Sequence, residues 1–271
     1  MQGRHTPHPT LSESMRLTFL GTGTSQGVPL LTCSCRVCTS PDPRDRRFRS
    51  SVWIEEGPLS IIIDTSPDFR SQALRASISQ LDAVLYTHSH ADHVAGFDDL
   101  RSYSVKNGNR IPIYADPFTL SRLEKAFDYA FDLKVRSPAY VCPEPHLITG
   151  PFSLGPLTFT PLPVPHGSIT TTGFRVDLHN QPRLVYLPDC AAVPQEIRNL
   201  IRKIPTLIID GLREDPHPTH LTIAQAIEIS QDIQAGQTWL THLTHQTLHA
   251  ERDATLPPPV RLAYDSLQLT L

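Results

Sequence analysis

The sequence predicts an α+β fold in which two β-sheets face each other and helices cover their outer sides. Strand-like apolar runs recur along the whole chain, whereas helical periodicity is found in only three segments. The runs follow one another in blocks and do not alternate strictly with helices, as they would in a doubly wound parallel sheet. Several runs are solidly aliphatic, which is typical of strands that are covered on both faces.

Ten strands are expected, five in each half of the chain: residues 16–20, 51–54, 59–64, 83–87, 111–114, 157–161, 173–178, 184–187, 207–210 and 238–241. Apolar residues at helical spacing predict one helix over residues 120–131 and a second over 223–233. The second begins with Thr222-x-x-Gln225, the pattern of a capping box. A shorter and weaker helical pattern covers residues 69–74.

The composition is that of a globular chain. Among 271 residues, 24 Lys and Arg against 27 Asp and Glu leave a net charge of −3, which excludes a strongly basic nucleic-acid binder. No linker divides the chain, so we expect one domain over residues 15–271 behind a flexible tail at residues 1–14. The tail lacks an apolar signal region, and no apolar run approaches the roughly 20 residues of a membrane span. We therefore expect a cytoplasmic protein without a membrane partner.

The strongest chemical signal is a cluster of histidines and a carboxylate directly after the strand at 83–87: His88, His90, Asp92 and His93. A lone histidine is usually an ordinary structural residue, but four ligand-type side chains in six residues indicate a metal site. Imidazole and carboxylate ligands suit zinc, iron or manganese. His88 and His90 point to one side of an extended segment, and Asp92 and His93 face a neighbouring position. This spacing indicates two ions about 3.5–4 Å apart.

Three further ligand-type residues each follow an apolar strand directly. They are His166, Asp189 and His242. Taken singly, each has an equally good explanation as an ordinary loop residue. Their repeated position after apolar strands favours a common site.

The seven residues form a series that resembles the ligand series of the metallo-β-lactamase-fold hydrolases, and the resemblance runs from residue 16 to about residue 271. It implies a four-layer αβ/βα sandwich with the metal ions at one edge of the two sheets. The family pattern implies one ion on His88, His90 and His166, a second on Asp92, His93 and His242, and Asp189 as a bridging ligand. Asp64, at the end of the strand at 59–64, matches an aspartate that supports the site in this family.

A second cluster narrows the resemblance to one branch. The glycine-rich turn at 21–27 and the segment Cys33-Ser-Cys35-Arg-Val-Cys38 are similar to the branch typified by phosphoribosyl 1,2-cyclic phosphate phosphodiesterase. Three cysteines this close together suit metal ligation better than a disulfide framework. The resemblance implies a structural zinc ion on these cysteines and His245, a closed Cys₃His site. The alternative is three buried thiols without a metal.

His220 precedes His242 by 22 residues and matches a catalytic histidine of this branch. The resemblance implies that His220 protonates a leaving oxygen or stabilises phosphoryl charge, and that Asp189 shares the catalytic role as bridging ligand. His217 is expected to face solvent. Cys190 adjoins the position where zinc β-lactamases carry a cysteine ligand, but we expect its side chain to point away from the metals.

The predicted function is a metal-dependent phosphodiesterase that hydrolyses a small cyclic or nucleotide-like diester by means of a hydroxide bridging two divalent ions of Zn, Mn or Fe. The alternatives are a thioester or lactam hydrolase on the same fold, an RNA-processing nuclease, and a nucleic-acid-binding zinc knuckle. Only 22 residues separate His166 from Asp189, too few for the tRNA-gripping arm of the nuclease family. Nucleic acid is therefore not the expected partner. A homodimer, and substrate contacts by Arg70 and Arg101, are left open.

Overall fold

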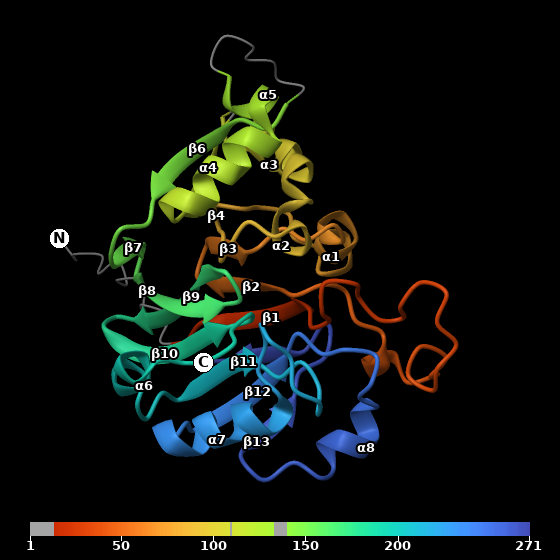
Figure 1. Cartoon of the computed structure of the whole chain (residues 1–271). Coiled ribbons are helices and arrows are strands. Elements are labelled where there is room, and N and C mark those ends of the chain that lie inside the picture. Colours follow the sequence, from red (N-terminus) through yellow and green to blue (C-terminus); the bar gives the residue numbers. More distant parts are fainter. Residues whose placement is uncertain (1–13, 109, 133–139) are drawn as a thin grey trace, which may run out of the picture.

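Two seven-stranded β-sheets lie face to face, with helices on the outer side of each (Figure 1). The computed structural model describes residues 14–108, 110–132 and 140–271. The arrangement is the αβ/βα sandwich that the ligand series implies, so the predicted fold class is confirmed. The tail expected at residues 1–14 lies outside the described residues except for Ser14. None of the described helices has the length and apolar character needed to cross a membrane.

The first sheet is antiparallel on one side and parallel on the other. Its strands, in spatial order, are β14 (Gln268–Thr270), β1 (Arg16–Gly21), β2 (Ser51–Glu56), β3 (Leu59–Ile63), β4 (Ala83–Leu85), β5 (Ile111–Ala115) and β6 (Pro143–Leu147). The strands from β3 to β6 run parallel. Its helical segments are η1 (Pro43–Asp45), α1 (Phe69–Arg75), α2 (Ala91–Val94), η2 (Phe97–Leu100), α3 (Arg101–Lys106), α4 (Pro117–Ala126) and α5 (Asp128–Phe131).

The second sheet mirrors this division. Its strands, in spatial order, are β13 (Val260–Leu262), β12 (Gln237–Thr241), β11 (Thr206–Asp210), β10 (Gln181–Leu187), β9 (Ile169–Leu178), β8 (Leu157–His166) and β7 (Phe152–Leu154). The strands from β10 to β13 run parallel. The helices of this half are α6 (Gln195–Leu200), α7 (Ile223–Ile233) and α8 (His249–Asp253), and α7 has the predicted capping box.

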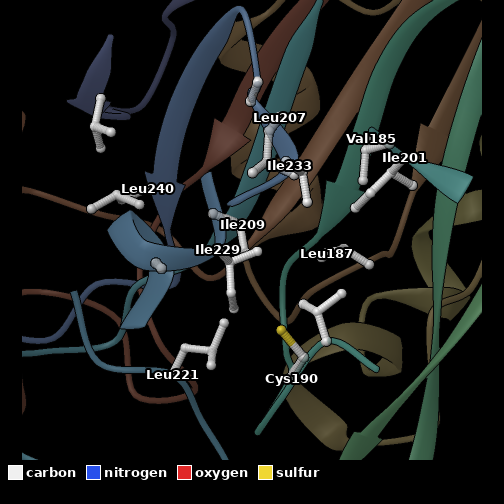
Figure 2. Close-up of a cluster of buried hydrophobic side chains, with 14 of the residues drawn as sticks. Val185, Leu187, Cys190, Ile201, Leu207, Ile209, Leu221, Ile229, Ile233 and Leu240 are labelled. Carbon is white, nitrogen blue, oxygen red and sulfur yellow. The ribbon is translucent and has the colours of Figure 1, made fainter. Parts of the chain in front are cut away.

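Three apolar clusters hold the layers together. One lies between the sheets and includes Phe19, Phe159 and Phe174. A second packs under the helices of the first half. The third joins the second sheet to α6 and α7, with Ile209 and Ile229 among its members (Figure 2). Burial on both faces explains why the central strands are solidly aliphatic.

All ten expected strands are present. The observed elements differ from the expected ones where the local sequence pattern is weak. β8 was expected to end at Pro161 but continues to His166 in a long hairpin with β9. β7 pairs only with residues 157–159, so the proline-rich half of β8 pairs with β9 on one side alone. Proline is tolerated at such an edge because no backbone donor is needed there. The extension matters because it places His166 at the edge of the sheet where the site lies.

Four short strands were not expected: β6, β7, β13 and β14. Each has three to five residues, too few for a clear alternation of apolar and polar side chains. The helix expected over residues 120–131 is divided into α4 and α5 at Phe127, whose backbone leaves the helical region.

Candidate active site

All seven ligand-type residues meet at one edge of the sandwich. His88 and His90 follow β4, Asp189 follows β10 and His242 follows β12; β4 runs parallel to β3, and β10 and β12 both run parallel to β11. Because the carboxyl ends of parallel strands meet at one edge of a sheet, residues far apart in the sequence become neighbours. Two groups result, each with its ligand atoms within 4.8 Å of one another: His88, His90 and His166, and Asp92, His93, Asp189 and His242. These groups correspond to the two ligand sets that the family resemblance implies; Asp189, implied as a ligand of both ions, falls in the second group.

In the first group, hydrogen bonds orient the imidazole rings. His166 Nδ1 donates to the carbonyl of Thr219 at 2.8 Å, which leaves Nε2 as the nitrogen with a lone pair. His88 Nδ1 lies 3.0 Å from the hydroxyl of Thr87, which itself donates to Asp64, so Nδ1 carries the proton and Nε2 has the lone pair. Nε2 of His88 lies 2.9 Å from Nδ1 of His90. Burial lowers the pKa of His166 to about 4, which keeps this ring neutral.

The second group surrounds the carboxylate of Asp189. His93 Nε2 lies 3.3 Å from Asp189 Oδ1, and His242 Nε2 lies 3.3 Å from Asp189 Oδ2. His166 Nε2 of the first group is 3.9 Å from the same carboxylate, so Asp189 lies between the two groups. Asp92 completes the group at 3.2 Å from His93 Nε2.

Asp64 supports both groups. Its Oδ2 accepts a hydrogen bond from His93 Nδ1 at 2.7 Å and another from the hydroxyl of Thr87 at 2.8 Å, and Thr87 in turn holds His88. The carboxylate is completely buried. The backbone of Asp64 has φ +65°, and that of His242 has φ +60°, a left-handed conformation that is rare for residues other than glycine. Such backbone conformations concentrate at functional sites.

The donor set fits divalent metal ions. His93 Nε2, both ring nitrogens of His242 and Asp189 Oδ1 are buried without a hydrogen-bond partner among the described residues. Burial opposes a positive charge on His93, but Asp189, Asp92 and Asp64 outweigh burial and raise the pKa of His93 well above its usual value. The carboxylates thus favour positive charge at this point, and bound cations would supply it while satisfying the unpaired atoms.

His220 lies against this cluster and is held by a residue that the sequence reasoning missed. Its Nδ1 is 2.7 Å from Oδ2 of Asp210, a completely buried carboxylate at the end of β11. The ring centroid of His220 lies 4.7 Å from those of His166 and His242. Asp210 is the last residue of an apolar strand, and Asp64 directly follows another. This similar position is the signal that could have identified Asp210 from the sequence.

Cys190 and His217 lie next to the site, and the structure shows the surroundings of each. Cys190 is buried in the apolar cluster that joins the second sheet to α6 and α7 (Figure 2), and it belongs to none of the ligand groups among the described residues. His217 was expected to face solvent, but it is half-buried, and its ring centroid lies 5.1 Å from that of His220. His217 lines a pocket together with His220, so its ring is only partly open to solvent. Arg70 and Arg101 are exposed, and Arg101 lies 3.8 Å from Asp98.

The cysteine cluster is also assembled. His245 Nδ1 lies 3.3, 3.4 and 3.6 Å from the sulfurs of Cys33, Cys35 and Cys38. Cys33 and Cys35 are half-buried, and Cys38 is buried. The amide of Cys38 points to the sulfur of Cys35 and lowers its pKa to about 6, which favours the thiolate. Four donors around one point fit a closed zinc site.

Comparisons with known proteins agree with this geometry. Residues 60–243 match the family described as the Beta-lactamase superfamily domain. A solved diphosphatase from the PhnP family is 38% identical, with a TM-score of 0.88, and the match covers 95% of this chain and 97% of that one. The short form of human tRNase Z is 19% identical, with a TM-score of 0.67 over 94% of this chain and 98% of that one, and shows the fold alone.

Curated relatives have other names. The chain is 37% identical to the Octanoyltransferase of Porphyromonas gingivalis over 94% of its own length, but spans only about half, 51%, of that protein. It is 28% identical to the Coenzyme PQQ synthesis protein B of Xanthomonas euvesicatoria pv. vesicatoria, with 78% of each chain covered. The chain belongs to the beta-lactamase superfamily, as a metallo-β-lactamase-fold hydrolase that resembles the PhnP family.

Proposed function

We propose that the protein hydrolyses small phosphodiesters with two divalent metal ions, and that His220 protonates the leaving oxygen. The observation that carries this proposal is the position of His220. Asp210 holds its Nδ1, and one ring nitrogen of His220 lies within 4.8 Å of ligand atoms on both His166 and Asp189. A proton donor is thus placed beside the metal-ligand candidates, where a phosphoryl group would bind.

The residues that would hold the two ions are those of the two groups, with Asp189 shared: His88, His90, Asp92, His93, His166, Asp189 and His242. When bound, two such ions lower the pKa of water and neutralise charge on a phosphoryl group. Zinc, manganese and iron all suit imidazole and carboxylate ligands. The cysteine cluster with His245 would hold a third, structural ion.

The pair of Asp210 and His220 supplies the proton. Burial and the neighbouring His242 lower the pKa of His220 to about 4, so the ring is neutral near pH 7 in the free protein and acts as an acid only after it has bound a proton. Oδ2 of Asp210 lies 2.7 Å from Nδ1 and orients the ring. Nε2 is then the nitrogen that gives its proton to the departing oxygen, and the products are a phosphomonoester and an alcohol.

Several features favour a small substrate over a nucleic acid. β9 and β10 occupy residues 169–178 and 181–187, which leaves no inserted arm between His166 and Asp189. The net charge of −3 is not suited to binding many phosphates. The solved structure that is described as a diphosphatase is the more similar of the two structures compared above. A site of three thiolates also suits a reducing compartment such as the cytoplasm.

The test is the leaving-group dependence of the variant His220→Ala. On an alkyl diester, whose alkoxide needs a proton, we expect a loss of about 10²–10⁴-fold in kcat/KM. On bis-p-nitrophenyl phosphate, whose phenolate departs unaided near neutral pH, the loss should be much smaller. Metal content, measured by elemental analysis, should be unchanged. His146→Ala serves as the control, because His146 is stacked on Tyr114 and is not one of the site residues.

Equal losses on the two substrates would assign His220 to stabilising phosphoryl charge. Full activity of the variant on both substrates would remove His220 from the mechanism. If the metal-loaded wild type hydrolyses thioesters or lactams and no phosphodiester, the proposed function is wrong.

A further inference from the structure

A pocket of about 210 Å³ opens beside His220, which is one of its lining residues, and neither His88 nor His90 lines it. Three segments form its walls: the glycine-rich turn at 24–27, part of the loop 212–220, and residues 244–246. The side chains that line it are mainly polar, including Gln26, Arg213 and Gln246. None of the described residues that line it is an aspartate or a glutamate.

Arg213 is the cation of this pocket. Its Nε donates to the carbonyl of Asp215 and its Nη2 to the carbonyl of Pro216, both at 3.2 Å. These bonds fix the guanidinium without neutralising it, and no ion pair joins Arg213 to a carboxylate within the described parts of the chain. Burial and the neighbouring His220 lower the pKa of His217, which keeps that ring neutral. The pocket therefore combines one fixed positive charge with neutral hydrogen-bonding groups.

We propose that this pocket binds the leaving group of the phosphodiester and selects an alcohol that carries an anionic group. The inference rests on the proposed function and adds the chemical class of the leaving group. In an in-line displacement, the attacking and leaving oxygens lie on opposite sides of phosphorus. His220 protonates the leaving oxygen, so the leaving group must lie on the side of His220, and that is where the pocket opens.

The step is balanced by water alone. The oxygen of water forms a new bond to phosphorus as the bond from phosphorus to the leaving oxygen breaks. The departing oxygen takes a proton from His220, and a proton from water restores the histidine. The anionic group of the released alcohol is the part that Arg213 binds, by charge-assisted hydrogen bonds.

Two supports hold the walls of the pocket in place. Arg49 Nε donates to the carbonyl of Ser25 at 2.8 Å, and its Nη1 pairs with Asp68 at 3.0 Å, which ties the glycine-rich turn to the N-terminal end of α1. His245 lines the pocket while its Nδ1 faces the three sulfurs of the cysteine cluster. The structural ion would thus also fix one wall of the pocket.

The experiment uses a diester with two different alcohols on one phosphorus, methanol on one side and glycerol 3-phosphate on the other. Phosphorus NMR of the products shows which alcohol the metal-loaded enzyme releases. The wild type should release glycerol 3-phosphate and leave methyl phosphate. In Arg213→Gln, the ratio of the two outcomes should fall by about 10- to 100-fold, the effect of losing a hydrogen bond to a charged group.

Arg202→Gln is the matched control, because Arg202 is exposed, also donates to a backbone carbonyl, that of Asp232, and does not line the pocket. Its product ratio should equal that of the wild type. Gln26→Glu is a second variant, at an exposed position where folding is not at risk. It places a carboxylate in the pocket and should likewise reduce release of the anionic alcohol.

The outcomes separate the two proposals. Preferential release of methanol by the wild type, or a ratio that neither Arg213→Gln nor Gln26→Glu changes, would overturn the assignment of the pocket while leaving the phosphodiesterase intact. Failure to hydrolyse this or any simpler diester, such as bis-p-nitrophenyl phosphate, would instead overturn the proposed function on which the assignment rests.

Discussion

The two clusters of ligand-type residues are built in opposite ways. The histidine and aspartate cluster draws its members from the ends of several strands, and His88, His93, Asp189 and His242 are almost completely buried. The cysteine cluster takes three donors from one six-residue segment and a fourth from His245, and it lies in a partly exposed loop. One cluster is part of the sandwich, and the other is attached to it.

The two clusters also differ in whether all of their donor atoms can be used by one metal ion. The cysteine cluster offers four donors around one point, which is a complete tetrahedral set. The other cluster has seven donors in two groups, several of them without partners, and His220 and a pocket adjoin it. A closed set can only stabilise the fold, whereas an incomplete set beside a pocket can bind a substrate. Three predictions test this division of roles.

Chelation should have the largest effect. We expect three ions in the fully loaded, active protein, and a mild chelator should remove the two at the histidine and aspartate cluster first, with complete loss of activity. The reason is that the closed cysteine site has no open coordination position through which a chelator can attack. Elemental analysis alongside activity measurements checks the order. Two ions or fewer in active protein, or earlier loss of the cysteine-bound ion, would contradict the division.

Asp64→Asn should lower kcat/KM by about 10- to 100-fold, because Asp64 orients His93 directly and His88 through Thr87. Asparagine has the same shape and tolerates the left-handed backbone at this position, so the fold should persist. Occupancy of the cysteine site should stay complete. Asp177→Asn, which alters an ion pair with Arg175 on β9, is the control and should retain its activity.

Cys35→Ser should have the smallest effect on chemistry and should act mainly on stability. Loss of the structural ion removes binding free energy that counts as folding free energy, and we expect the Tm to fall by about 5–10 °C. KM should rise a few-fold, because His245 also lines the pocket. Calorimetry with steady-state kinetics measures both quantities.

Cys142→Ser changes a half-buried cysteine outside the cluster and is the matched control. It should retain three ions and an unchanged Tm. If Cys35→Ser kept its full thermal stability and lost only turnover, the cysteines would belong to the active site, and the division between the two clusters would fail.

The metal-ligand candidates could be found from the sequence because they are placed by a local rule. Asp189 and His242 are polar residues that closely follow apolar strands, and the change in polarity marks the end of a buried element. The same rule holds for Asp210, which ends β11, yet its role depends on a partner ten residues away in an irregular loop. No periodicity connects these two positions.

The sequence by itself determined the types of ligand, their order along the chain and the buried strands that carry them, because hydrophobic periodicity and abrupt polar residues are local properties. Only the tertiary structure decided how they meet. His245 reaches Cys33 across 212 residues, and His166 reaches the site because the proline-rich half of β8 pairs with β9. The pocket beside His220 likewise joins three distant segments. Such contacts follow from the order of strands in the sheets, which is set by packing of the whole chain rather than by any local pattern.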